Sequence, residues 1–265
     1  MIKPLVVATD LDGTLLRSDS TLSGRTRAEL RKIRASGTRV VAATARPPRV
    51  IDDLFGDDDL IDVAICGNGA IRYEAGSHDI RILHAIPDEV IRRVVAELAA
   101  AVPGVGFAVE TGQRVLFEPN YRYRPTLDNH RVPVATVDDL FGEDLVKVMV
   151  WLPDEDPDAA WALVRDSLGP LVECTWSAER APLEIAATGV SKAATLAEVC
   201  AEWDVPAEAV LAFGDAPNDL PMLAWAGTGI AVANAHPAVL AAVEGRTASN
   251  DEDGVAAYLA ALFSR

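Results

Sequence analysis

The order of segments along the chain predicts an α/β fold, in which a doubly wound (Rossmann-like) parallel sheet is interrupted by an inserted α+β domain. At both ends of the chain, short apolar runs typical of buried strands alternate with helical segments, which is the order found in parallel sheets. Between these ends, strand patterns follow one another with few helices, which favours a mostly antiparallel unit. We therefore expect a core domain of residues 1–83 and 186–265 and an inserted domain of residues 84–185.

The first half of the core domain begins with Leu5-Val6-Val7-Ala8-Thr9, a continuous apolar and β-branched run. Such a run suits a strand that is buried on both faces, as in a parallel sheet. We expect the next helix to end at Gly37, because glycine commonly follows the last residue of a helix. The expected helix, strand, helix and strand occupy residues 23–36, 38–43, 47–55 and 61–65.

The inserted domain begins with a helix after Pro87, since apolar residues recur at helical spacing between Val90 and Leu98. Thr111-Gly112 separates two strand-like runs at residues 105–110 and 113–118, which predicts a hairpin. A strand, a helix and two further strands follow at residues 146–152, 158–168, 171–176 and 183–187.

The second half of the core domain resumes the alternation of helices and strands. Its expected helix, strand, helix and strand occupy residues 191–203, 209–213, 217–224 and 228–232, and two more helical segments end the chain. We found no internal repeat or low-complexity tract.

Composition excludes several classes of protein. The 265 residues include 24 Lys and Arg against 40 Asp and Glu, which gives a formal net charge of −16. A surface this acidic repels phosphate backbones and anionic membranes, so we expect neither a nucleic acid nor a membrane as partner. The sequence has no run of ~20 apolar residues and no signal-peptide pattern, which predicts a cytoplasmic protein. Three widely spaced cysteines argue against a disulfide framework or a zinc site and favour buried or partly buried thiols.

Two carboxylates follow the first predicted strand, in Asp10-Leu11-Asp12-Gly13-Thr14. Gly13 allows the backbone to turn sharply and leaves amide groups free to face an anion. Because close carboxylates repel, we expect either a magnesium ion or a separation of their pKa values. The alternative is an ordinary turn stabilised by an aspartate side chain.

Two further positions offer a hydroxyl and an ammonium group. Thr44, in Thr44-Ala45-Arg46, follows the second predicted strand and can bind a phosphate oxygen, although a threonine there is usually only a helix N-cap. Lys192 lies near a helix start, where the helix dipole disfavours a cation, so a bound anion explains it best. A solvated surface lysine is the alternative.

A second acidic group, Gly214-Asp215-Ala216-Pro217-Asn218-Asp219, follows the strand that ends at Phe213. A capped helix with Pro217 in its first turn explains Asp215 but not the whole group. If these turns share one edge of one sheet, they assemble two carboxyl groups, a hydroxyl, an ammonium and a metal-binding acid. That set suits phosphoryl transfer through an aspartyl-phosphate, with Mg²⁺ offsetting the negative charge.

The order and spacing of these segments resemble those of the haloacid dehalogenase superfamily of phosphatases. The resemblance is closer to its Cof-type branch, whose large α+β cap (type IIB) is inserted between the second and third motifs. Further similar segments are Gly67-Asn68-Gly69-Ala70, Leu183-Glu184-Ile185, Val232 to Pro237 and Thr247 to Val255. The inserted domain is matched only by its position and size.

The resemblance implies a role for each matching residue. Asp10 would attack phosphorus, and Asp12 would protonate the leaving alcohol and then deprotonate the attacking water. Mg²⁺ would bind the Asp10 carboxylate, the Asp12 carbonyl group and Asp215. The residues implied in phosphate binding are Thr44, Lys192, Asn218, Gly13 and Ala45, and the implied supporting residues are Asp219, Arg46 and Asn68.

Two features of the sequence bear on specificity. The branch usually has glycine between Thr44 and Arg46, and Ala45 stands there, which puts Arg46 as a substrate contact in question. In the inserted domain, Tyr121-Arg122-Tyr123-Arg124 and Asn129-His130-Arg131 form a basic and aromatic patch. This patch suits an anionic or ring-bearing substrate, and the alternative is a surface loop whose arginines pair with acids.

The sequence thus predicts a Mg²⁺-dependent phosphatase that acts on a small phosphorylated metabolite of the sugar phosphate, pyridoxal phosphate or flavin mononucleotide class. It is expected to be a monomer or a small homo-oligomer. Two alternatives are a sugar phosphomutase and a phosphate-binding module without turnover, and the presence of both Asp10 and Asp12 argues against the second.

Overall fold

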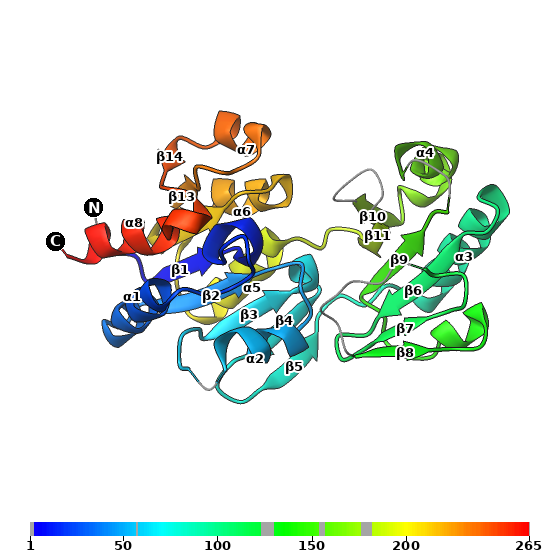
Figure 1. Ribbon diagram of the computed structural model, residues 1–265, viewed down its shortest axis with the longest axis horizontal. Helices are drawn as coiled ribbons and strands as arrows, with labels where there is room; N and C mark the ends of the chain where they lie inside the picture. The colour runs from blue at the N-terminus through cyan, green and yellow to red at the C-terminus, as the bar shows by residue number, and fades with distance from the viewer. Residues whose placement is uncertain (1–2, 57, 123–129, 154–156, 176–181, 265) are drawn as a thin grey trace. The chain divides into compact units, whose positions relative to one another are not determined.

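The computed structural model describes residues 3–56, 58–122, 130–153, 157–175 and 182–264 (Figure 1). Its contacts divide the chain into two compact units. The core unit comprises residues 1–81 and 191–265, and the insert unit comprises residues 82–190. The second boundary lies five residues beyond the expected one, because the strand Leu183–Ala187 pairs with strands of the insert unit.

The core unit is built on an eight-stranded sheet with the order β14-β13-β12-β1-β2-β3-β4-β5. The strands are β1 (Val6–Thr9), β2 (Arg39–Ala43), β3 (Val63–Cys66), β4 (Ile71–Glu74), β5 (Asp79–Ile82), β12 (Val210–Gly214), β13 (Thr228–Ala231) and β14 (Gly245–Arg246). From β14 to β3 all neighbouring strands are parallel. Every residue of β1, β3 and β12 is buried, as the continuous apolar runs of these segments predict.

Strand β1 lies at the point where the order of the sheet reverses. It pairs with β2 on one side and with β12 on the other, in the registers Val6–Arg39 and Val6–Val210. The chain moves outward from β1 to β2 and β3, and later outward from β12 to β13 and β14, so right-handed crossovers place helices on both faces. Ligand sites of open α/β sheets form at the carboxyl ends of the strands at such a switch point.

Six helices belong to the core unit, within the residues that the structure describes: α1 (Gly24–Ala35), α2 (Arg49–Phe55), α5 (Lys192–Glu202), α6 (Leu220–Trp225), α7 (Pro237–Ala242) and α8 (Gly254–Phe263). Helix α1 packs against α8, and α5 packs against α6. The side chains of Ser23 and Ser191 accept hydrogen bonds from Thr26 N and Ala194 N, which caps the first turns of α1 and α5.

The insert unit is an α+β domain in which two helices pack with one sheet. Its six-stranded sheet has the order β10-β11-β9-β6-β7-β8, in which only the pair β7–β8 is parallel. The elements are α3 (Asp88–Ala101), β6 (Gly106–Glu110), β7 (Val115–Phe117), β8 (Arg131–Pro133), β9 (Lys147–Trp151), α4 (Pro157–Leu168), β10 (Val172–Thr175) and β11 (Leu183–Ala187). Helices α3 and α4 pack on each other, and their apolar residues form one core with β6, β9 and β11.

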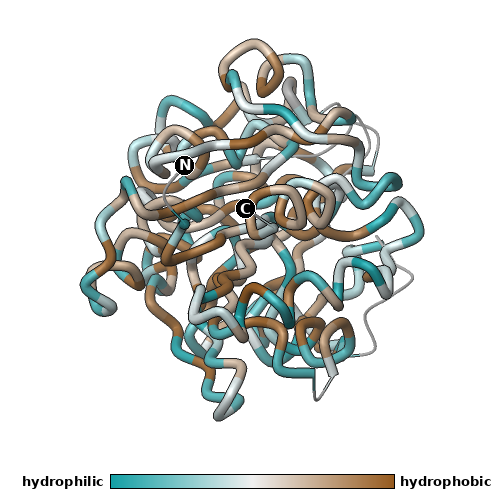
Figure 2. The backbone as a smooth tube through the Cα atoms, turned by 90° about the vertical axis from the view of Figure 1, so that its left-hand side faces the viewer, coloured by the Kyte–Doolittle hydropathy of each residue, from teal (hydrophilic) through white to brown (hydrophobic). Residues whose placement is uncertain are grey.

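The doubly wound α/β core with an inserted α+β unit confirms the predicted fold class. In Figure 2, brown hydrophobic segments alternate with teal hydrophilic ones along the chain. Four short strands were not predicted, β4, β5, β8 and β14; β5 and β8 lie at sheet edges, expose most of their residues and lack an apolar run. Cys66 and Cys200 are buried free thiols and Cys174 is a partly buried one. No helix in the described parts of the chain is long and apolar enough to cross a membrane.

Candidate active site

The loop after β1 places the first pair of aspartates at the carboxyl edge of the core sheet. Asp10 continues the register of β1, since its N–H donates to Phe213 O of β12 at 3.0 Å. Asp12 (φ −75°, ψ 121°) and Gly13 (φ 77°, ψ −6°) are the central residues of a type II turn. Such a turn favours glycine at its third position, and a Cβ on Gly13 would lie 2.5 Å from Asp215 Oδ2. Gly13 therefore allows the two acidic loops to approach.

A buried lysine links the acids of the two loops. Lys192 Nζ, in the first turn of α5, donates to Asp10 Oδ1 at 2.6 Å and to Asp219 Oδ1 at 2.7 Å. The side chain of Lys192 is 2% exposed, that of Asp10 7% and that of Asp219 0%. The alternative of a solvated surface lysine is therefore wrong, and the ammonium group lies against the carboxylates at the end of β1 and after β12.

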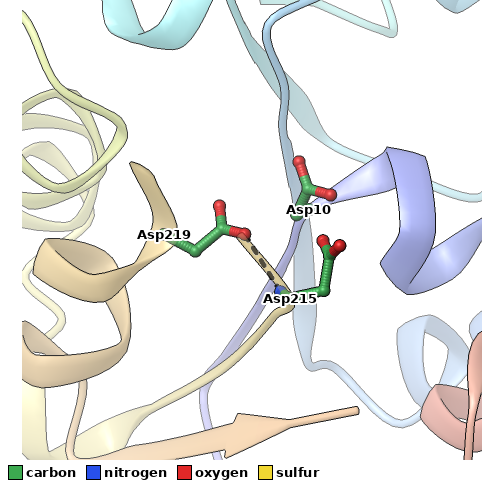
Figure 3. Close-up of side chains that lie close together, drawn as sticks. All are labelled: Asp10, Asp215 and Asp219. Carbon is green, nitrogen blue, oxygen red and sulfur yellow. Dashed lines mark hydrogen bonds between the residues drawn. The ribbon is translucent and has the colours of Figure 1, made fainter. Parts of the chain in front are cut away.

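The remaining oxygens of the second acidic loop have defined roles. Asp219 Oδ2 accepts hydrogen bonds from the backbone N–H groups of Asp215 and Ala216, both at 3.0 Å, so Asp219 caps its own turn while its other oxygen binds Lys192. Figure 3 shows the bond to Asp215 and the position of the Asp10 carboxylate nearby. Thr14 Oγ1 donates to Asp215 Oδ1 at 2.8 Å. Sequence reasoning did not assign a role to Thr14, although it directly follows the Asp10–Gly13 segment.

Burial and charge shift the pKa values of this cluster. The pKa of Asp10 is raised by its burial and by the charges of Asp219 and Asp215, and Lys192 opposes this rise. The pKa of Asp215 is raised by burial and by Asp219, against the hydrogen bond from Thr14. Burial lowers the pKa of Lys192, but its two carboxylate partners outweigh this and raise it, so the ammonium stays charged.

The donor set of this cluster fits a hard divalent cation. Oxygens of Asp10, Asp215 and Asp219 lie within 4.8 Å of one another, and Lys192 contributes one positive charge against these three carboxylates. Asp219 already uses both oxygens for N–H donors and Lys192, so Asp10 and Asp215, which flank the Gly13 turn, are the carboxylates best placed to bind a metal ion. Carboxylate oxygens are the ligands that Mg²⁺ prefers.

Asp12 and Arg46 form a separate ion pair in the core unit. Arg46 Nε donates to Asp12 Oδ2 at 2.7 Å, and a second guanidinium nitrogen contacts Oδ1. The side chain of Asp12 is 52% exposed and that of Arg46 is 19% exposed. The Asp12 carboxylate thus points to Arg46 and not into the acid–lysine cluster, and its carbonyl group as a metal ligand stays a prediction.

Thr44 and Ala45 complete the turn that carries Arg46. Thr44 is fully buried, and its Oγ1 accepts a hydrogen bond from Arg46 N at 3.1 Å. The helix-cap alternative is wrong, because α2 begins at Arg49 and its N-cap residue is Pro48. Ala45 is partly buried and is not one of the five described non-glycine residues with positive φ. Its methyl group therefore imposes no backbone strain, and the Arg46 side chain still reaches Asp12.

Asn218 and Asn68 are also brought together, since Asn218 Nδ2 donates to Asn68 Oδ1 at 3.2 Å. Asn68 has a φ of 59°, a left-handed conformation that asparagine tolerates better than most residues. The structure thus places the sequence-predicted core residues at the carboxyl edge of the sheet. They form the acid–lysine cluster, the Asp12–Arg46 pair and the Asn218–Asn68 pair, with Gly13 in the turn after Asp12 and Thr44 and Ala45 in the turn before Arg46.

The predicted patch of the insert unit is only partly described, since Tyr123, Arg124 and Asn129 lie outside the described residues. Tyr121 is fully buried beside Ala108 and Val115, and the Arg131 guanidinium lies 5.5 Å from the centre of its ring. Tyr121 therefore packs inside this unit. The predicted patch, in contrast, had aromatic side chains stacking on a substrate.

The fold and the site define an α/β enzyme whose carboxylates gather at the switch point of a doubly wound sheet. The chain belongs to the haloacid dehalogenase-like hydrolase family, whose model matches residues 7–259. This confirms the family that the motifs indicated and makes the protein a hydrolase.

Several named relatives of the chain are phosphatases. It is 31% identical to 5-amino-6-(5-phospho-D-ribitylamino)uracil phosphatase YitU of Bacillus subtilis, over 99% of this chain and 98% of the relative. It is 29% identical to pyridoxal phosphate phosphatase YbhA of Escherichia coli, over 96% and 97% of the two chains. Among solved structures, the subclass IIB sugar phosphatase BT4131 has the same fold, with a TM-score of 0.82, 24% identity and 98% of each chain covered.

Proposed function

We propose that this phosphatase uses Mg²⁺ and an aspartyl-phosphate on Asp10 to hydrolyse a small phosphorylated metabolite. The observation that carries the proposal is the buried ammonium of Lys192, 2.6 Å from Asp10 and 2.7 Å from Asp219, beside the open carboxylate of Asp215. A charged lysine held against a nucleophilic carboxylate and a metal-binding acid is suited to stabilise a phosphoryl group in transit.

Asp10 is the proposed nucleophile. Its Oδ1 is held by Lys192, which leaves Oδ2 to attack phosphorus and to form the acyl-phosphate bond as the bond to the leaving oxygen breaks. Attack requires the ionised carboxylate, which burial disfavours and the charge of Lys192 favours. When bound by Asp10 and Asp215, Mg²⁺ would supply further positive charge to the carboxylate and the phosphoryl oxygens.

Asp12 is the proposed general acid and base. It is two residues beyond Asp10 and half exposed, so its carboxyl group is open to a substrate oxygen and to water. Asp12 gives its proton to the leaving alcohol in the first step and removes one from the attacking water in the second. Arg46, which contacts both carboxylate oxygens, orients this group.

The phosphate-binding set is proposed as Thr44, Lys192, Asn218, Gly13 and Ala45. Lys192 contributes charge, while the turn at Gly13 and the segment Thr44-Ala45 contribute hydrogen-bond donors at the same edge of the sheet. Asp219 supports the site by holding Lys192 and the Asp215 loop, and Asn68 by contacting Asn218.

The proposed substrates are small molecules that carry one phosphate group, of the sugar phosphate, pyridoxal phosphate or flavin mononucleotide class. Support comes from the substrates named for YitU and YbhA, a phosphoribityl-aminouracil and pyridoxal phosphate, which both join a phosphate to a ring-bearing body. The protein's acidity also favours a single phosphate bound locally over a long polyanion, for which contacts over an extended acidic surface would be needed.

Phosphate release tests the proposal. The purified protein is incubated with sugar phosphates, nucleotides, pyridoxal phosphate, flavin mononucleotide and p-nitrophenyl phosphate, first with Mg²⁺ and then with EDTA. We expect release that depends on Mg²⁺ and that falls by more than about a thousandfold in Asp10→Asn, while Asp53→Asn, at an exposed aspartate of α2, keeps wild-type turnover.

Ordinary turnover by Asp10→Asn, or equal rates with and without Mg²⁺, contradicts the proposal. A product analysis dominated by an isomerised sugar phosphate, with little inorganic phosphate, indicates a phosphomutase instead.

A further inference from the structure

Two C-terminal segments that resemble the family have no role in the mechanism above. One runs from Val232 to Pro237, between β13 and α7, and the other from Thr247 to Val255, before α8. The structure joins them: Asn250 N donates to Asn234 Oδ1 at 2.9 Å, and Ala233 N donates to Ala248 O at 3.4 Å. They therefore form one unit of structure beside the carboxyl edge of the core sheet.

The two joined segments make hydrogen bonds to the loop that carries Asp12. Asn234 Nδ2 donates to Gly13 O at 2.7 Å, and Asn250 Nδ2 donates to Leu16 O at 3.0 Å. We call Asn234 and Asn250 the asparagine clamp. Asn250 is 5% exposed, while Asn234 is exposed to solvent. The clamp thus runs from Gly13 O through two side chains to Leu16 O and spans the loop from its turn to its end.

Further contacts fix the far end of the same loop. Arg17 makes a two-point ion pair with Asp253, at 3.0 and 2.9 Å, and the N–H and Oγ of Ser18 both donate to Asp251 at 2.8 Å. These contacts hold residues 17 and 18, and Thr14 is held by its hydrogen bond to Asp215, so the clamp adds a contact at Gly13, next to Asp12.

The contact uses both ends of the side-chain amide at position 234. Asn234 accepts from Asn250 N and donates to Gly13 O at the same time, since a side-chain amide offers a neutral donor and an acceptor in one planar group. Gly13 has no side chain, and its φ of 77° is one of several conformations open to glycine, so the hydrogen bond from Asn234 to its carbonyl oxygen helps to select it.

The position of Gly13 O determines where its neighbours point. Because the peptide between Gly13 and Thr14 is planar, holding its carbonyl oxygen toward Asn234 directs the Thr14 N–H to the opposite side. The same turn contains Asp12, whose side chain is 52% exposed and therefore little restrained by packing. Arg46 contacts both oxygens of the Asp12 carboxyl group, and the clamp holds the backbone from which that group extends, so its orientation depends on both contacts.

We infer that Asn234 is a positioning residue for the general acid–base Asp12, which it serves by holding Gly13 O through the hydrogen bond of its amide. The inference rests on the proposed function, since it assumes that Asp12 protonates the leaving group.

Two variants separate this role from general packing. Asn234→Ala removes both contacts. Asn234→Asp keeps an acceptor for Asn250 N but loses the donor to Gly13 O, because a carboxylate only accepts hydrogen bonds. Since Asn234 is exposed, neither change leaves a buried void. His236→Ala is the matched control: it removes the cap that His236 Nδ1 gives to Ala238 N in the same segment and keeps the backbone bond from His236 N to Asp215 O.

The readout is kcat/KM for phenyl phosphate and for p-nitrophenyl phosphate, two substrates of similar shape. Phenolate leaves poorly without a proton, whereas p-nitrophenolate leaves readily, so only the first needs a well-placed acid. We expect both Asn234 variants to lower kcat/KM for phenyl phosphate by about 10- to 100-fold and for p-nitrophenyl phosphate by less than about 3-fold. His236→Ala should leave the ratio of the two constants at its wild-type value.

Equal losses on the two substrates in the Asn234 variants, no loss on either, or the same change of ratio in His236→Ala overturns the inference. These outcomes differ from a failure of the proposed function, which appears in the wild-type protein as missing Mg²⁺-dependent release or in Asp10→Asn as ordinary turnover.

Discussion

The carboxylate Asp215 is predicted to destabilise the metal-free protein, and Asp215→Asn to stabilise it. The side chain is partly buried, and its oxygens lie within 4.8 Å of those of Asp10 and Asp219. One such pair of like charges repels by about 3 kcal/mol at an effective dielectric constant of about 20, and the attraction of Lys192 offsets part of this. Asparagine keeps the shape and an acceptor for Thr14 Oγ1.

The net gain expected for Asp215→Asn at pH 8 in EDTA is about 1–3 kcal/mol, or a rise in Tm of about 2–4 °C for each kcal/mol. The sign follows from the pKa of Asp215, which is raised above its ordinary value of 3.8 chiefly by burial and, further, by Asp219. The folded protein therefore favours the protonated group, whose stabilisation is complete below pH 3.8 and is lost as the pH rises through the folded pKa. The advantage of the variant should vanish near pH 4.

The assay is thermal unfolding of both proteins between pH 4 and pH 8, in EDTA and in Mg²⁺. Wild type should gain stability from Mg²⁺ by mass action, and Asp215→Asn should gain much less. Asp53→Asn, on the exposed side of α2, controls for the change in net charge. A lower Tm of Asp215→Asn at pH 8 in EDTA, or an unchanged response to Mg²⁺, refutes the reasoning.

Three further predictions concern the same unit. Lys192→Met leaves the Asp10 and Asp219 carboxylates buried without their ammonium and should cost about 3–5 kcal/mol in urea unfolding; a loss below about 1 kcal/mol contradicts the buried ion pair. Gly13→Ala places a Cβ 2.5 Å from Asp215 Oδ2 at a φ of +77°, so turnover and Tm should both fall. The control is Gly24→Ala, where a Cβ meets nothing within 4 Å and Tm should not fall. The same change in Tm for both variants contradicts the close approach of Gly13 to Asp215. Asp253→Asn should lower Tm at pH 7, because the ion pair with Arg17 outweighs burial and lowers the pKa of Asp253. The stability from this pair is present above pH 3.8 and is lost as the pH falls through the lower pKa of the folded protein. A difference in Tm from wild type that persists at pH 2 argues against the pair.

The buried parallel strands were predictable because each is a continuous apolar run, and β1, β2, β3, β12 and β13 lie within about two residues of the expected positions. Strands such as β5 and β8 gave no comparable signal, since most of their residues are exposed and their pairing depends on the neighbouring strand. The boundary after β11 was misplaced for a similar reason: pairing with β9, not local composition, assigns that strand to the insert unit.

The gathering of the candidate site residues at one sheet edge was predictable, and their contacts were less so. Strand ends marked Asp10, Thr44 and Asp215, because parallel strands bring their carboxyl ends to one edge. The sequence did not show that Asp12 pairs with Arg46, or that Asn234 reaches Gly13 across 221 positions of the chain. Such contacts depend on side-chain direction after folding, which spacing along the chain does not encode.

Trapping the phosphoenzyme tests the central claim most directly. Asp12→Asn, which lacks the proposed base for the second step, is mixed with p-nitrophenyl phosphate and Mg²⁺, quenched in acid and digested for mass spectrometry. If Asp10 is the nucleophile, one phosphoryl group is found on the peptide that contains Asp10, and none in the double variant Asp10→Asn with Asp12→Asn. A phosphoryl group on another residue, or an unchanged label in the double variant, contradicts this role of Asp10.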